Sequence, residues 1–559
     1  MSARLLIFVC LATSAQAGTW YVNGAAGAGG NGQTWGTAYQ HVQDALAVAQ
    51  PSDQVWVAQG TYLPGDATSA RSVSFQIPSN VALYGGFAGG ETLLAQRDWV
   101  AHETILSGDL HQDDLPGFVN RADNCYHVVQ ISAAGLSTGF DGFTVRAGNA
   151  DGAGTAGSGG GMMVSGTTGS GPTFAHLRFV DNSALVNGGG VAVVGNLNFA
   201  DSLFEHNHAG AGGGIYADDS GIDLVRCVLR SNDATGTGGA CALGDFGGAT
   251  FSNCLITGNS ALYAGGVYVT YGHATLRSCT LAANHATSYG ALAFSGFGLT
   301  DVFDSILWGN TDTTHPGAYE QQLNDGNTSL SFCAIQGSAA PWNLDPLFVN
   351  ALGPDGIAGT ADDDLRLSCM SPYIDAGSNS MAASGTTDFA GNARFLDDPA
   401  TPDTGVGSAP IVDLGAYEFV CGCDDVQRYC SSVPNSTGVA ATIDWSGSTS
   451  VFANSLTLMA SGAPALKTGL FFYGSQQANV PWGDGLRCVG GSLQRLALVQ
   501  TSAAGTATLP LAFGLPPIGS GPHAALPGTT WNFQFRFRDP TGGPNGWNSS
   551  DALEIHFCR

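Results

Sequence analysis

The stretch Phe204-Glu-His-Asn-His-Ala-Gly-Ala-Gly-Gly-Gly-Ile215 contains the pattern that decides the fold. A bulky apolar residue precedes an asparagine by three positions, and a cluster of glycines follows that asparagine. The pattern recurs at spacings of 25, 25, 27, 25 and 26 residues. Its asparagines are Asn182, Asn207, Asn232, Asn259, Asn284 and Asn310. A fixed period of this length predicts a solenoid, in which each repeat buries its apolar face against its neighbours.

The content of one repeat indicates which kind of solenoid forms. The glycine clusters leave no room for helices of ten or more residues, whereas short runs such as residues 224–229 and 274–281 suit strands. About 25 residues can form one coil of three short strands, and coils stack at roughly 4.8 Å by parallel pairing. An asparagine at the same place in every coil can join a ladder of buried amides. We therefore predict an all-β chain built on a right-handed parallel β-helix.

The chain divides into four predicted parts. Residues 1–17 contain an apolar run and the small-residue pattern Ala15-Gln16-Ala17, typical of a secretory signal peptide cleaved after Ala17. Residues 18–120 are expected to form the N-terminal cap and first coils, with an amphipathic helix over 37–50 covering the open end. Residues 121–420 are the β-helix, with a loop inserted at 155–171 and a proline-rich, loop-rich end from residue 340. Residues 421–559 lack the period, and their alternating apolar runs predict a small antiparallel β-sandwich.

Charge excludes several classes of partner. The net charge is −26 and Lys467 is the single lysine, whereas nucleic acids and anionic membranes are bound by basic surfaces. Beyond the signal peptide, no stretch reaches the ~18 apolar residues of a membrane helix. We therefore expect a secreted or cell-surface protein without a transmembrane helix, with a polysaccharide or a cell-surface ligand as the candidate partner.

The cysteines are expected to be structural. Cys227, Cys254 and Cys279 each precede a repeat asparagine by five residues, so they should stack as buried thiols or form a disulfide between adjacent coils. Five cysteines near and in the tail should staple that domain: Cys421, Cys423, Cys430, Cys488 and Cys558. Because five is an odd number, one of them either pairs with Cys369 or stays free.

One corner of the β-helix concentrates titratable residues. Aligning the coils on their asparagines places six such residues together over three coils: Asp181, Glu205, His206, His208, Arg230 and Asp233. A lyase needs a basic residue beside carboxylate-bound calcium, and a glycoside hydrolase needs paired carboxylates at a fixed separation. This cluster is the candidate catalytic site, although Glu205 and Arg230 can equally form an ion pair without catalytic meaning. No cofactor-binding fingerprint is present.

An acidic run after the repeats is the candidate metal site. Residues Asp355, Asp362, Asp363 and Asp364 surround glycines in a flexible loop and offer the oxygen ligands that calcium prefers. The spacing does not match an EF-hand, and a solvated acidic loop is the alternative. Calcium is thus the one cofactor that the sequence suggests.

Several motifs resemble those of exported bacterial β-helix proteins. Phe179-Val-Asp-Asn182 with Gly188-Gly-Gly-Val191 is similar to the repeats of polymorphic outer-membrane proteins. Further similar segments are Leu83-Tyr-Gly-Gly-Phe87, Gln96-Arg-Asp-Trp99, Thr104-Ile-Leu-Ser-Gly-Asp109 and Asp141-Gly-Phe-Thr144. Ser371-Pro-Tyr-Ile-Asp-Ala-Gly377 with Asp413-Leu-Gly-Ala-Tyr-Glu418 resembles the end of the same unit in the choice-of-anchor group.

The resemblance spans roughly residues 20–420 and implies a pectate-lyase-like solenoid at the cell surface, followed by an appended β module. It implies an adhesin-like or cell-envelope component without enzymatic activity. The alternative is a polysaccharide lyase, a glycoside hydrolase or a carbohydrate-binding protein that uses the face of the β-helix.

Overall fold

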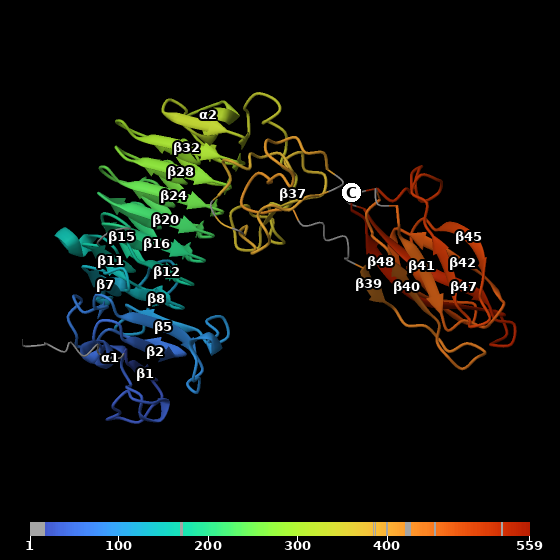
Figure 1. Cartoon of the computed structure of the whole chain (residues 1–559), viewed down its shortest axis with the longest axis horizontal. Coiled ribbons are helices and arrows are strands. Elements are labelled where there is room, and N and C mark those ends of the chain that lie inside the picture. The colour runs from blue at the N-terminus through green and yellow to red at the C-terminus, as the bar shows by residue number, and fades with distance from the viewer. Residues whose placement is uncertain are drawn as a thin grey trace, which may run out of the picture.

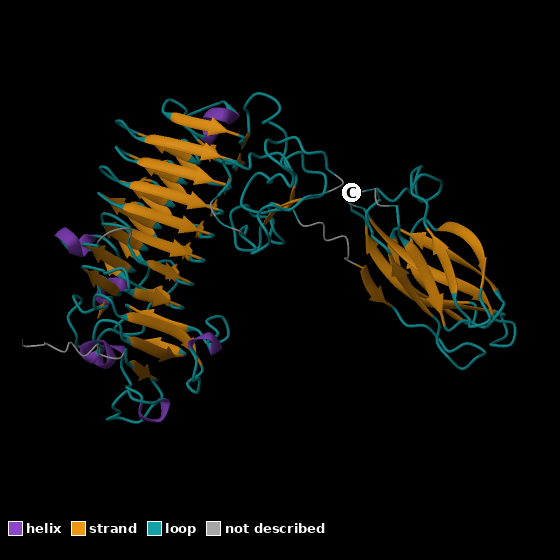
Figure 2. Ribbon diagram, viewed as in Figure 1, coloured by secondary structure: helices purple, strands orange, loops and turns teal. Residues whose placement is uncertain are grey.

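The protein consists of a parallel β-helix, a loop-rich segment and an antiparallel β domain (Figures 1 and 2). The computed structural model describes residues 17–167, 171–383, 385, 387–398, 401–419, 426–451, 454–526 and 529–558. The predicted fold class is confirmed, because four parallel sheets run along the solenoid and two antiparallel sheets share a core in the tail. The predicted signal peptide lies almost entirely outside the described residues. Within the described ranges, no helix is long and apolar enough to cross a membrane.

Four sheets form the sides of the solenoid, and neighbouring strands in each are parallel. The eleven-stranded sheet contains β1 (Thr19–Val22), β2 (Gln54–Ala58), β5 (Ala82–Phe87), β8 (Gly139–Asp141), β12 (Thr173–Ala175), β16 (Leu197–Ala200), β20 (Gly221–Val225), β24 (Gly248–Ser252), β28 (His273–Arg277), β32 (Leu299–Phe303) and β35 (Thr328–Ser331). The ten-stranded sheet contains β3 (Gly60–Tyr62), β6 (Thr104–Ser107), β9 (Thr144–Arg146), β13 (Arg178–Val180), β17 (Leu203–Glu205), β21 (Val228–Arg230), β25 (Leu255–Thr257), β29 (Thr280–Ala282), β33 (Ile306–Trp308) and β36 (Ala334–Ile335).

The other two sheets are shorter. The eight-stranded sheet contains β4 (Phe75–Gln76), β7 (Val129–Ser132), β11 (Met162–Ser165), β15 (Val191–Val194), β19 (Ile215–Asp218), β23 (Cys241–Leu243), β27 (Val267–Val269) and β31 (Leu292–Phe294). The seven-stranded sheet contains β10 (Asn149–Ala150), β14 (Ser183–Ala184), β18 (His208–Ala211), β22 (Asp233–Thr237), β26 (Ser260–Tyr263), β30 (His285–Ser288) and β34 (Thr311–Asp312).

A regular coil has four strands rather than the three that the period suggested. In one coil β16, β17, β18 and β19 follow each other and enter four different sheets. The extra corner lies between β17 and β18, where His206 has a φ of 53° and the buried Asn207 follows it. The left-handed residue turns the chain sharply, so a segment that could form one strand forms two.

The repeat asparagines form one hydrogen-bonded ladder inside this corner. The Asn232 Nδ2 donates to Asn259 Oδ1 at 2.9 Å and to the Phe204 carbonyl at 2.9 Å. Equivalent amide contacts connect all six asparagines, from Asn182 to Asn310. At the last rung, Asn310 Nδ2 donates to Oε1 of Gln322, at the end of α2 (Ala318–Gln322). The ladder satisfies polar groups that would otherwise be costly to bury.

Alternation along each strand separates the core from the outer surface. Phe179 and Phe204, at the centres of β13 and β17, are fully buried and stack with ring centroids 5.2 Å apart. The residues that flank them in each strand are partly or fully exposed. The outer side of the ten-stranded sheet therefore carries the side chains that can meet a ligand.

Two further predicted details of the β-helix and its cap differ in the structure. The covering helix α1 spans only Val42–Val48, because Tyr39 instead forms a parallel bridge with Val22 of β1. Its Val42, Ala45 and Leu46 are buried against the first coils. The segment expected to be a loop at 155–171 contains β11, which joins the eight-stranded sheet between β7 and β15.

Short 3₁₀ helices lie in connecting loops of the described chain, at Trp35–Thr37, Leu94–Gln96, Arg121–Asp123 and Gly154–Gly157.

The segment from 340 to 419 packs back onto the upper coils (Figure 1). In the described part of this segment, β37 (Phe348–Asn350) and β38 (Asp364–Leu367) form a two-stranded sheet, and most other residues lie in loops. Asn253 Nδ2 donates to the Thr387 carbonyl at 3.0 Å, and the Ala416 amide donates to Thr280 Oγ1 at 3.1 Å. Gly258 permits this approach, since a Cβ there would meet the Gly359 carbonyl oxygen at 2.3 Å.

The tail is a β-sandwich with its own core. One sheet contains β39 (Val426–Tyr429), β48 (Trp547–His556), β47 (Thr530–Arg538), β42 (Thr468–Gly474) and β45 (Gln494–Gln500). The facing sheet contains β40 (Thr442–Ser446), β41 (Thr457–Ser461) and β46 (Ala507–Pro510), and a hairpin is formed by β43 (Gln476–Trp482) and β44 (Gly485–Gly490). Ile443 and Leu458 of one sheet share a buried cluster with Phe533 and Phe535 of the other.

The described cysteines differ between the two domains. Cys430 and Cys488 form a disulfide in the tail, and Cys558 is also disulfide-bonded, whereas Cys369 is free. Cys421 and Cys423 lie outside the described residues. In the β-helix, Cys227, Cys254 and Cys279 are free, buried thiols. The Cys254 thiol donates to the Leu224 carbonyl of the preceding coil at 3.4 Å, so the column is stacked without covalent links.

Candidate binding face

The outer side of the ten-stranded sheet carries a cleft of about 420 Å³, here called the Trp99 cleft. Its floor comes from β9, β13, β17 and β21, including Thr144, Arg178 and Leu203. Trp99 forms one side, and Phe389 from the segment 340–419 also lines it. The cleft thus combines aromatic rings with charged side chains above a rigid sheet.

Trp99 is held in place by ring contacts with His176 and Arg97, and both of these residues are fixed by Asp141. Its ring lies 3.9 Å from the His176 ring, centroid to centroid, and the Arg97 guanidinium lies 5.1 Å from it. Asp141 pairs with Arg97 at 2.7 Å and with His176 Nδ1 at 2.9 Å. Burial opposes the charge of Asp141, but the hydrogen bonds from His176 and Arg97 outweigh it and lower the pKa of that carboxyl. The ring is therefore fixed in position while 37% of the residue remains exposed.

A glycine lets the loop that carries Trp99 approach the sheet. The Asp98 amide donates to the Gly86 carbonyl at 2.8 Å. Gly86 has a φ of 87°, and a Cβ there would meet the Trp99 backbone at 2.8 Å. Any larger residue would push the loop away from β5 and move the ring out of the cleft.

A second hollow, the acidic cavity, has a volume of about 770 Å³. Its lining includes Ser107 of β6, Arg146 of β9 and the loop from Asp109 to Arg121. Arg146 lies two residues from Thr144, so the acidic cavity and the Trp99 cleft open on the same side of the sheet. Burial raises the pKa of Asp114 in this cavity, although Asn124 and Arg121 act in the opposite direction.

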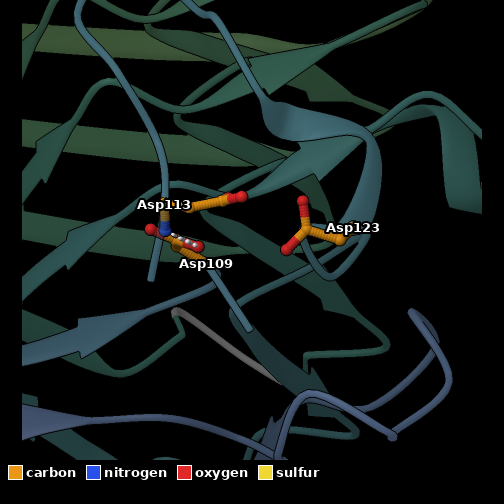
Figure 3. A group of neighbouring side chains, drawn as sticks. All are labelled: Asp109, Asp113 and Asp123. Carbon is orange, nitrogen blue, oxygen red and sulfur yellow. Dashed lines mark hydrogen bonds between the residues drawn. The ribbon is translucent and has the colours of Figure 1, made fainter. Parts of the chain in front are cut away.

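Three carboxylates gather at the edge of this loop, and Figure 3 shows their side chains pointing toward one another. Oxygens of Asp109, Asp113 and Asp123 all lie within 4.8 Å of one another. Both Asp109 oxygens accept backbone amides, from Asp113 at 3.2 Å and Asp114 at 3.1 Å. Asp123 Oδ2 accepts the His111 amide at 3.2 Å. Each of these two carboxylates therefore already has a hydrogen-bond partner in the loop.

The structure places the six predicted catalytic residues around one corner but in three environments. Glu205 and Arg230 are neighbours on β17 and β21 and form an ion pair, with Arg230 Nε 2.8 Å from Glu205 Oε1. On the other side of the corner, His208 and Asp233 are neighbours in the seven-stranded sheet, and His208 Nδ1 lies 2.8 Å from Asp233 Oδ2. Asp181 and His206 occupy the corner itself and line the acidic cavity.

The predicted calcium ligands do not converge on one point. The Asp355 amide donates to Asp362 Oδ2 at 3.1 Å, and Asp363 Oδ2 accepts the Thr360 amide at 3.1 Å. Asp364 pairs with Arg366 instead. In the parts of the chain that the structure describes, no three of these four carboxylates come within 4.8 Å of one another.

Sequence reasoning missed the Trp99 cleft. Trp99, Arg97 and Asp141 lie outside the region of regular period, so aligning coils could not bring them together. The sequence nevertheless contains a signal, because Gln96–Trp99 and Asp141–Thr144 are two of the segments that resemble those of exported β-helix proteins. The structure shows that these two motifs contact each other through Arg97 and Asp141.

Comparisons with known proteins add little to this geometry. No protein-family model matches the chain, and no curated protein matches it either. Among solved structures, it is similar to the enzymatically active domain of tailspike protein 4 of bacteriophage CBA120. The identity is 11% and the TM-score 0.24, and the match covers 92% of this chain and 64% of that one. A likeness at this level carries no functional argument.

Proposed function

We propose that this protein is an exported, adhesin-like component of the cell surface that binds a polysaccharide in the Trp99 cleft without cleaving it. The observation that carries the proposal is the fixed, part-exposed Trp99 ring beside charged residues on a rigid sheet. Sugar rings present apolar faces that pack on aromatic side chains, and their hydroxyls bond to charged and polar groups.

The surroundings of the cleft support binding rather than catalysis. Arg97 and His176 are both engaged by Asp141, and Glu205 is engaged by Arg230. A general acid or base must be free to exchange a proton with the substrate. Paired with Asp141, Arg97 and His176 hold the Trp99 ring in position.

Retention on immobilised polysaccharides tests the proposal. We expect the full chain to bind at least one member of a panel of neutral and acidic polymers, and Trp99→Ala to weaken that binding about 10-fold or more. The matched control is Phe297→Ala, because Phe297 is 83% exposed and lies between β31 and β32, away from the cleft. Equal retention of Trp99→Ala and the unmodified chain, or no retention of either, would overturn the proposal.

The acidic cavity favours a second candidate function, a polysaccharide-cleaving enzyme. The raised pKa of Asp114 and the nearby Asp181 and His206 would suit a proton donor facing a polymer. Product sizes and new chain ends should be followed over hours in the same polymers. Depolymerisation that disappears in Asp114→Asn would establish this second function in place of the first.

A further inference from the structure

The segment from 340 to 419 buries a carboxylate whose charge has no partner. Asp375 is 0% exposed. Its backbone amide donates to Asp413 Oδ1 at 2.7 Å, but neither oxygen of its own carboxylate accepts a hydrogen bond of normal geometry within the described residues, and the Asp398 backbone amide acts on it only weakly. Burying a carboxylate without partners is strongly unfavourable, so such groups are normally paired or bound to a metal ion.

Two further carboxylates of the same segment lie close to that of Asp375. Oxygens of Asp375, Asp397 and Asp403 lie within 4.8 Å of one another, and the latter two residues are exposed. The backbone explains the approach, since the amides of Thr404 and Gly405 both donate to the Asp375 carbonyl at 3.0 Å. The group is therefore closed on the Asp375 side and open to solvent on the other.

The neighbouring charges increase the imbalance. Burial, followed by the charges of Asp413, Asp397 and Asp398, raises the pKa of Asp375 to about 7, although the Asp398 backbone amide acts in the opposite direction. Arg394 does not neutralise the group, because its guanidinium donates to the Asp413 and Gly415 carbonyls and lies 3.2 Å from Glu418.

The Asp109 group differs in this respect. Its buried member is Asp109, and both carboxylate oxygens of Asp109 accept hydrogen bonds from backbone amides. The group therefore lacks a buried, unpartnered carboxylate like that of Asp375.

We infer that Asp375, Asp397 and Asp403 form a calcium site that ties Asp397 and Asp403 to the buried Asp375. Calcium takes six to eight oxygen ligands in flexible geometry, and carboxylates bind it through one or both oxygens. Three carboxylates with one open side leave room for water to complete the shell. Magnesium demands a stricter octahedral arrangement and loses its water reluctantly, which favours calcium here.

The test uses the full chain, stripped with a chelator and titrated with calcium by calorimetry and equilibrium dialysis. We expect the double variant Asp397→Asn/Asp403→Asn to bind one calcium ion fewer per chain than the unmodified protein. Both side chains are exposed, so the fold should persist, as circular dichroism would check. The matched control Asp362→Asn/Asp363→Asn alters the acidic run at 355–364 and should retain the full number of ions.

Three outcomes would overturn the inference: no calcium bound by the unmodified chain, equal stoichiometry in the Asp397/Asp403 double variant, or displacement of the bound calcium by equimolar magnesium. Asp375→Asn gives a second measurement and should also lose one ion. If that variant fails to fold, the double variant still decides.

Discussion

At the scale of the residue, several charged groups in the β-helix pair with a group in an adjacent coil. Stacking brings Arg230 onto Glu205 and His208 onto Asp233, because residues at equivalent positions pair in parallel strands. A different situation holds where the segment 340–419 meets the coils. There the chain buries carboxylates such as Asp304, which is 0% exposed and follows β32.

Asp304 should make stability depend on pH. Burial raises its pKa from 3.8 to about 6, although the Ser378 amide and two arginines act in the opposite direction. A carboxyl whose folded pKa is raised stabilises the protein fully below pH 4, and that contribution is lost as the pH rises through about 6. At neutral pH, ionisation of the buried Asp304 is expected to have lowered the free energy of unfolding by about 2–3 kcal/mol.

We therefore expect Asp304→Asn, which stays neutral, to lose less stability than the unmodified protein between pH 4 and pH 7. Urea unfolding at a series of pH values measures this difference. Other buried carboxyls titrate in the same range, so the comparison between the two proteins is the relevant quantity. If the free energies of unfolding of the two proteins change in parallel with pH, Asp304 ionises in the folded state without loss of stability.

At the scale of the element, the asparagine ladder holds the corner between the ten-stranded and seven-stranded sheets. Asn232 sits at its centre and is fully buried. Its side-chain Nδ2 donates to the Phe204 carbonyl and to Asn259 Oδ1. Its Oδ1 accepts hydrogen bonds from the backbone amide and the side-chain Nδ2 of Asn207. One side chain thus connects three successive coils.

Replacing Asn232 by alanine should destabilise the β-helix by about 3 kcal/mol or more, because several buried polar groups lose a partner together. Thr235→Ala in the same coil is the control, since Thr235 is exposed and should change stability by less than about 0.5 kcal/mol. Denaturant unfolding of both variants gives the comparison. Similar small losses in the two would mean that the ladder contributes little.

At the scale of the whole molecule, the β-helix and the tail are separate folding units. Each has its own buried cluster, and that of the tail contains residues only from beyond position 425. The tail also contains the disulfide between Cys430 and Cys488, which closes a separation of 58 residues. A loop of that size restricts the unfolded chain by about 4 kcal/mol in the chain-entropy description.

Removing this disulfide should therefore affect one domain only. In the full chain, Cys430→Ala/Cys488→Ala is expected to lower the stability of the tail by about 2–4 kcal/mol and leave the unfolding of the β-helix unchanged. Differential scanning calorimetry resolves the two transitions. Cys369→Ala, which removes a free thiol before the tail, is the control and should not move the tail transition. A single transition that shifts as a whole would contradict the division into two units.

The sequence by itself determined the features that depend on the period. The parallel stacking, the coil register and the position of Asn232 in the core follow from a repeat of about 25 residues, because equivalent residues in adjacent coils must pair. Two details tied to the period differ from expectation: left-handed residues such as His206 divide one strand of the coil into two, and the predicted loop at 155–171 contains β11.

The tertiary structure alone decided the two sites. Trp99 meets His176, and Asp375 meets Asp397 and Asp403, through loops that have no period to align. Their paths depend on contacts between residues far apart in the chain, such as that between Asn253 and Thr387, 134 positions apart. Local pattern specifies strands and turns, but where an irregular loop comes to rest depends on the packed surface that receives it.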